Sequence, residues 1–132
     1  MSQTNSSFNA LVQTVQQLRS EKGCPWDKKQ TTRSLRKYLI EEFGEIIDAI
    51  DNDDPDNLCE ELGDFLYLIL MIAEISKDEG KFTLEKVILR IDEKLIRRHP
   101  HVFATKQDLN EEQLRRQWTA IKENEKTNRN NY

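Results

Sequence analysis

The chain has 132 residues and a formal net charge of −4; 36% of its residues are hydrophobic and 33% are charged. This length suits one domain with one ordinary core. The acidic balance argues against nucleic acid as a partner, and the longest apolar run, residues 65–73, is too short to span a membrane.

The chain has few residues that break regular structure, since it contains only four glycines and three prolines. Long elements joined by few turns favour helices, so we expect an all-α fold: an antiparallel helical bundle of about five helices in a single domain, residues 1–132. The ends, 1–6 and 127–132, are expected to be flexible. Two cysteines make no disulfide framework and no leader pattern precedes residue 8, which favours a cytoplasmic location.

The first elements follow from apolar spacing. Apolar residues three and four apart from Phe8 to Leu18 predict a helix that ends near Gly23. Residues 23–30 then read as a structured loop, in which Trp26 either covers the edge of a core or stacks on a ligand. Thr31 or Thr32 is a candidate cap for a second helix. Its apolar stripe comprises Leu35, Leu39, Ile46 and Ile50.

Asp54 and Pro55 are typical of the cap and first residue of a third helix, and Gly80 of its end. This helix is apolar nearly all round in its second half, so we expect it to be the most buried element and to favour self-association. Thr83 is a candidate cap for a fourth helix that ends before Pro100. Its predicted core face comprises Leu84, Val87, Ile88, Ile91 and Leu95. Beyond it, Asn110 followed by Gln113 predicts the capping box of a fifth helix.

Two near-identical acidic pentads, residues 41–45 and 60–64, flank the turn at residues 51–55. In an antiparallel hairpin their carboxylates occupy two levels roughly 4.5 Å apart. The candidate metal ligands are the two pairs at these levels: Glu42 opposite Asp64, and Glu45 opposite Glu61. On a helical wheel Glu42 and Glu61 fall inside the apolar stripes, whereas Glu41 falls outside.

An unpaired carboxylate among aliphatic neighbours is costly, so Glu42 and Glu61 need a compensating partner. Oxygen-only ligation suits Mg²⁺, with Mn²⁺ as a possible substitute. The alternative is pairing with lysine or arginine from other helices. No histidine follows a glutamate by three residues, which disfavours a di-iron centre, and His99 and His101 are assigned a structural role at a helix end instead of zinc binding.

Basic residues gather near the predicted end of the fourth helix. Lys94, Arg97 and Arg98 either bind phosphate oxygens or complement the helix dipole. Lys122 on the fifth helix is a further candidate, and Trp118 shares its face. Trp118 is either a surface for a nucleobase or part of the core.

Taken together, four motifs carry a family resemblance. They are Gly23-Cys24-Pro25-Trp26-Asp27, the two acidic pentads, Arg97-Arg98-His99-Pro100-His101-Val102-Phe103, and Trp118-x-x-Ile121-Lys122. Over residues 8–126 the chain resembles the MazG family of nucleoside triphosphate pyrophosphohydrolases.

This resemblance implies an all-α fold that dimerises and binds magnesium on the hairpin. The all-round apolar third helix leads us to expect a homodimer or a dimer of dimers. It implies hydrolysis of a nucleoside triphosphate to monophosphate and pyrophosphate, as nucleotide-pool housecleaning. By motif position the metal ligands are Glu42, Glu45, Glu61 and Asp64. The positions that match substrate contacts are Lys94, Arg98, Trp118 and Lys122. Glu41 or Glu42 is the candidate general base. The alternative is a non-catalytic helical dimer that regulates by binding a nucleotide or protein.

Overall fold

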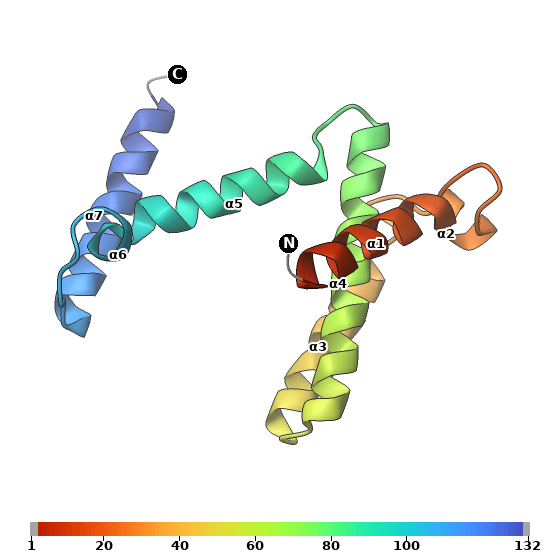
Figure 1. The fold of residues 1–132 in the computed structure, drawn as a ribbon, viewed down its shortest axis with the longest axis horizontal. Coiled ribbons are helices and arrows are strands. Elements are labelled where there is room, and N and C mark those ends of the chain that lie inside the picture. Colours follow the sequence, from red (N-terminus) through yellow and green to blue (C-terminus); the bar gives the residue numbers. More distant parts are fainter. Residues whose placement is uncertain (1–2, 131–132) are drawn as a thin grey trace. The chain divides into compact units, whose positions relative to one another are not determined.

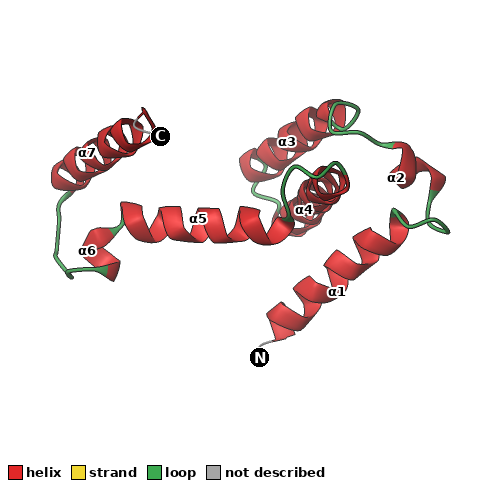
Figure 2. Cartoon of the chain, turned by 90° about the horizontal axis from the view of Figure 1, so that it is seen from above, coloured by secondary structure: helices red, strands yellow, loops and turns green. Residues whose placement is uncertain are grey.

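The computed structural model describes residues 3–130, and every regular element in this range is a helix (Figures 1 and 2). The elements in chain order are α1 (Gln3–Leu18), α2 (Pro25–Lys29), α3 (Arg36–Asp51), α4 (Pro55–Asp78), α5 (Leu84–Arg98), α6 (Pro100–Phe103) and α7 (Glu111–Asn130). The all-α prediction is confirmed. The chain divides into two compact units, Met1–Leu84 and Glu85–Tyr132. The single-domain assignment stays a prediction.

The first unit is built on a hairpin of α3 and α4 (Figure 1). The turn between them contains Asp53, whose positive φ of 50° is tolerated by aspartate better than by most residues. Asp54 caps α4 by accepting a hydrogen bond from the backbone N–H of Asn57 at 3.2 Å, and Pro55 is the first helical residue. These contacts reverse the chain, so α3 and α4 run antiparallel as predicted.

Helix α4 is the most buried element, as its sequence predicted. It lies between α3 and α1, and packs against both (Figure 2). Its apolar residues form the core with α1 and with the turn before α3. The fully buried core residues are Val15, Leu35, Leu68, Leu70, Met71 and Ile75. The helix stops where Gly80 adopts a positive φ of 72°, which confirms the predicted stop.

Two short helices were not predicted. Residues 23–30 were expected to be a loop, but α2 begins at Pro25 and brings Asp27 into the interior. Pro100 was expected only to end the preceding helix, but it also begins α6. The reason is the same in both places, because a proline that blocks one helix is a favourable first residue for the next.

Other boundaries also differ from the predictions. The side chains of Thr31 and Ser34 accept hydrogen bonds from each other's backbone N–H, at 3.0 and 2.9 Å, so a cap forms at Thr31. A turn follows, and α3 begins only at Arg36. Residues 3–6 and 127–130, expected to be loose, are helical, whereas residues 1–2 and 131–132 lie outside the described range.

Two predicted apolar faces are less buried than expected. Ile50, at the end of the α3 stripe, is exposed beside the turn. No residue of α5 is buried, although its apolar stripe has the regular spacing of a core face.

At the start of α7, Asn110 and Gln113 do form the predicted capping box, with reciprocal hydrogen bonds of 3.0 and 2.9 Å. Within residues 3–130 no helix has the length and apolar character needed to cross a membrane.

Gly23 offers a test of how α1 ends. A Cβ atom at this position would collide with the backbone carbonyls of Gln17 and Leu18, whereas one at Gly63, inside α4, would meet no atom within 4 Å. Gly23→Ala is expected to lower the free energy of unfolding by more than about 1 kcal/mol, and Gly63→Ala to raise it by roughly 0.5–1 kcal/mol. Urea unfolding measures both. Equal effects of the two substitutions would contradict the close approach at Gly23.

Candidate metal centre

Three glutamates converge on the α3–α4 hairpin. Glu42 and Glu45 are three residues apart on α3 and therefore share a face, and Glu61 faces them from α4. One carboxylate oxygen from each residue lies within 4.8 Å of the other two. The two acidic pentads thus supply one cluster from two helices, which we call the acidic trio.

The acidic trio is poorly compensated by the protein itself. The Glu61 side chain is buried, with 9% of the residue exposed, and Glu42 is half-buried. Glu42 Oε1 and Glu61 Oε2 are both buried, and neither has a hydrogen-bond partner among the described residues. A buried charged oxygen without a partner is costly. The two orphaned oxygens therefore call for a further group, and a cation fits the donor set.

Crowding also changes how readily these carboxyls lose their protons. Burial is the main cause that raises the pKa of Glu42 above its ordinary value. Contact with the Glu42 carboxyl raises the pKa of Glu61. Contact with the Glu61 carboxyl raises the pKa of Glu45. Burial and acidic neighbours together thus make the three carboxyls resist ionisation. A divalent cation among them would reverse this effect.

The remaining predicted acidic residues lie around the trio. Asp64 is exposed and does not belong to the set of mutually close oxygens. Its charge nevertheless raises the pKa of all three glutamates. Asp64 lies at the margin of the apolar stripe and has a shorter side chain than glutamate. This explains why its carboxylate stays outside the trio. Glu41 is exposed, in keeping with its place on the wheel. The roles of Asp64 as a ligand and of Glu41 as a base stay predictions.

All four predicted basic residues lie in the second unit. Lys94, Arg97 and Arg98 line a cleft of about 1070 Å³ along α5 and α7. Arg98 also contacts Trp118, with its guanidinium carbon 4.9 Å from the ring centroid, and the Lys122 ammonium lies 6.0 Å from the same centroid. The structure thus brings Arg98, Trp118 and Lys122 into one cluster.

Sequence reasoning missed Glu125, which is central to this cluster. Its carboxylate accepts hydrogen bonds from Arg97 Nε at 2.8 Å and from Arg98 Nη2 at 2.9 Å. The two guanidinium groups lower the pKa of Glu125 to about 2, with Arg98 as the larger cause. Trp118, Lys122 and Glu125 follow the helical spacing of four and three residues, so their shared face was visible in the sequence.

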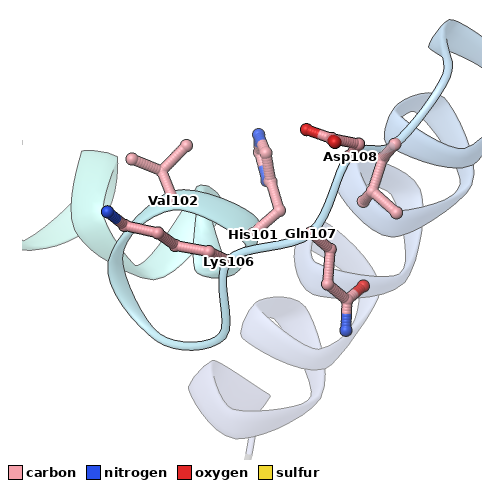
Figure 3. A pocket seen from close by; sticks show the side chains of 6 residues that line it. His101, Val102, Lys106, Gln107 and Asp108 are labelled. Carbon is pink, nitrogen blue, oxygen red and sulfur yellow. The ribbon is translucent and has the colours of Figure 1, made fainter.

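A smaller pocket of about 560 Å³ lies at the loop between α6 and α7 (Figure 3). His101 and Asp108 both project into it. The Nδ1 atom of His101 lies 3.0 Å from the side-chain amide nitrogen of Gln117, and His99 Nδ1 lies 2.5 Å from the Leu95 carbonyl oxygen. Both rings are held by neighbouring helices, which agrees with the predicted structural role of the two histidines.

Comparison with known proteins identifies the family. The MazG nucleotide pyrophosphohydrolase domain matches residues 30–103, which include the whole α3–α4 hairpin. The chain belongs to the MazG family. Its fold agrees with the crystal structure of a mazG-related protein from Thermotoga maritima, at a TM-score of 0.75 and 30% identity, over 87% of this chain and 98% of that one.

Among curated MazG relatives, the Thermotoga maritima "Nucleoside triphosphate pyrophosphohydrolase/pyrophosphatase MazG" is 46% identical over 96% of this chain and 48% of its own length. The Escherichia coli K12 "Nucleoside triphosphate pyrophosphohydrolase" is 39% identical over 92% of this chain and 46% of its own length. "Uncharacterized protein YabN" of Bacillus subtilis is 47% identical over 90% of this chain and 24% of its own length. The chain therefore spans half or less of the length of these relatives.

The raised pKa values in the acidic trio predict an unusual pH dependence for the metal-free protein. Groups whose pKa is raised by folding contribute stability that is complete below the unfolded value and is lost as pH rises through the folded value. In the presence of a chelator, the Tm of the wild type should therefore rise relative to that of Glu61→Gln as pH falls from neutral towards 4.5, the ordinary pKa of a glutamate. Scanning calorimetry measures this difference, with Glu60→Gln, an exposed neighbour, as control. Parallel pH profiles for wild type and Glu61→Gln would contradict the crowding.

Proposed function

We propose that the chain hydrolyses a nucleoside triphosphate to the monophosphate and pyrophosphate, with Mg²⁺ as cofactor and Mn²⁺ as a possible substitute. The observation that carries this proposal is the acidic trio with its two orphaned oxygens. Family membership and the relatives named nucleoside triphosphate pyrophosphohydrolase support it. Removal of unwanted nucleotides from the pool is the proposed cellular role, in the cytoplasm.

The acidic trio would hold the metal, with Asp64 as a fourth candidate ligand. Hard cations prefer such carboxylate oxygens, and Mg²⁺ takes a few of them while leaving positions for phosphate and water. When bound, the metal supplies Lewis-acid stabilisation of charge on phosphoryl oxygens. The residues themselves provide a fixed set of oxygens on two rigid helices, so that little reorganisation is needed when charge develops.

The basic cluster would bind the substrate. Lys94, Arg97 and Arg98 supply positive charge to triphosphate oxygens, and Lys122 adds a further cation. Trp118 offers an aromatic face with 40% of the residue exposed, which is suited to stacking against a nucleobase. Glu41 or Glu42 is proposed to accept a proton from the attacking water. Of these two, Glu42 already belongs to the acidic trio.

We also propose that the protein acts as a homodimer or a dimer of dimers. Large apolar side chains are exposed on both helices of the hairpin, which a second copy of the same surface would cover. They include Ile40, Phe43 and Ile47 on α3, and Leu62 and Ile69 on α4.

Pyrophosphate release from a panel of common ribo- and deoxyribonucleoside triphosphates tests the proposed reaction. The wild type is expected to turn over at least one substrate with Mg²⁺ and none with a chelator. Glu61→Gln removes a proposed ligand, and its turnover should fall by roughly 100-fold or more, because even residues that only support ligands contribute 10–100-fold.

Glu60→Gln is the matched control, because Glu60 is exposed and adjacent in sequence to Glu61. It should retain activity, and both variants should keep the helical far-UV signal. Undiminished turnover in folded Glu61→Gln would contradict the metal site. A wild type that binds nucleotides without turnover would instead favour the non-catalytic regulator.

A further inference from the structure

Glu125 joins the two consecutive arginines at the end of α5 to the middle of α7. Its Oε1 accepts from Arg98 Nη2 at 2.9 Å, and its Oε2 accepts from Arg97 Nε at 2.8 Å and, more weakly, from Arg98 Nε at 3.4 Å. The side chains of Arg98 and Glu125 are only 12% and 10% exposed. This is a sheltered, two-point contact, unlike the exposed ion pairs that contribute little to structure.

Arg98 is fixed from a second direction by Trp118, whose ring centroid lies 4.9 Å from the guanidinium carbon. The carboxylate of Glu125 takes one edge of the guanidinium, formed by Nε and Nη2. A guanidinium has five N–H donors in a planar fork, so the edge that contains Nη1 faces away from the carboxylate. That edge keeps the geometry required for bidentate binding of a phosphate.

The surrounding cleft keeps its attraction for anions despite Glu125. Five basic and two acidic side chains line it, a formal surplus of three positive charges. The basic residues are Arg90, Lys94, Arg97, Arg98 and Arg129, and the acidic ones are Glu93 and Glu125. One carboxylate that orders two arginines therefore leaves enough positive charge for a polyphosphate.

We propose that Glu125 is a positioning residue that holds Arg98 and Arg97 in the orientation that binds the triphosphate of the substrate. This inference rests on the proposed function. Glu125 itself does not touch the substrate, because an anion would repel the phosphates. It acts by limiting the rotamers of two long side chains, whose ordering would otherwise oppose binding. Its low pKa, about 2, keeps it charged at neutral pH.

The test compares Glu125→Gln with a matched variant, Glu112→Gln. Glu112 also pairs with an arginine on α7, Arg116 at 2.7 Å, but both side chains are 73% exposed. Glu125→Gln is expected to raise KM about tenfold, the size of one lost charge-assisted hydrogen bond. Its kcat should change by less than about twofold, because the acidic trio is untouched. Glu112→Gln should match the wild type in both constants.

Calorimetric titration with inorganic tripolyphosphate, without metal, gives a readout independent of turnover. Wild type should bind it, and Glu125→Gln should bind about tenfold more weakly. If Glu125→Gln does not fold, Glu125→Asp replaces it, since the shorter carboxylate keeps the charge but cannot span both arginines. The same direction of change is expected for that variant.

The outcomes separate this inference from the proposed function. If wild type hydrolyses nucleotides and the folded Glu125 variant has an unchanged KM, the positioning role is wrong and the reaction stands. If wild type hydrolyses none, the reaction is wrong, and tripolyphosphate affinity alone decides the role of Glu125. Tighter tripolyphosphate binding by Glu125→Gln would overturn the inference, because the carboxylate would then be competing with phosphate for the arginines.

Discussion

The crowding of three carboxylates between α3 and α4 is the main physical constraint on this hairpin. Like charges at this spacing repel each other, and two of their oxygens are buried without a hydrogen-bond partner. A fold tolerates such an arrangement only when packing elsewhere over-determines it. Here the packing comes from the apolar second half of α4, where Leu68 and Met71 are buried against α1 and the turn before α3. The stability of the hairpin thus keeps the carboxylates together.

The second unit provides the opposite chemistry. Along α5 and α7, Arg98 and Lys122 lie beside Trp118, and the carboxylate of Glu125 pairs with both Arg97 and Arg98. Like the acidic trio, this cluster is built from side chains fixed on helices.

Much of this was predictable from local patterns. The cap at Asp54, the stop at Gly80 and the capping box at Asn110 each depend on a few neighbouring residues, and all three formed as expected. The partial burial of Glu42 and the deeper burial of Glu61 followed from their positions on a helical wheel. The short helix α2 was missed because five residues show no periodicity.

Other features required tertiary packing. Two straight helices bearing acidic side chains of equal reach would bring all four carboxylates of the pentads together. In the structure Glu61 approaches both Glu42 and Glu45, whereas the shorter Asp64 remains outside the trio. The bridge from Glu125 to Arg97 and Arg98 joins positions 27 and 28 residues apart. Helical spacing puts Glu125 on the same face of α7 as Trp118, but no local pattern reveals which residues Glu125 binds.

Direct titration of the metal-free protein with Mn²⁺, with the free ion followed by electron paramagnetic resonance, tests whether the acidic trio binds a metal. The wild type is expected to show saturable binding at neutral pH. Glu61→Gln, which leaves the other two glutamates in place, is expected to lose this binding while remaining folded. Equal Mn²⁺ binding by the two proteins, or none by either, would contradict the assignment of the acidic trio as a metal centre.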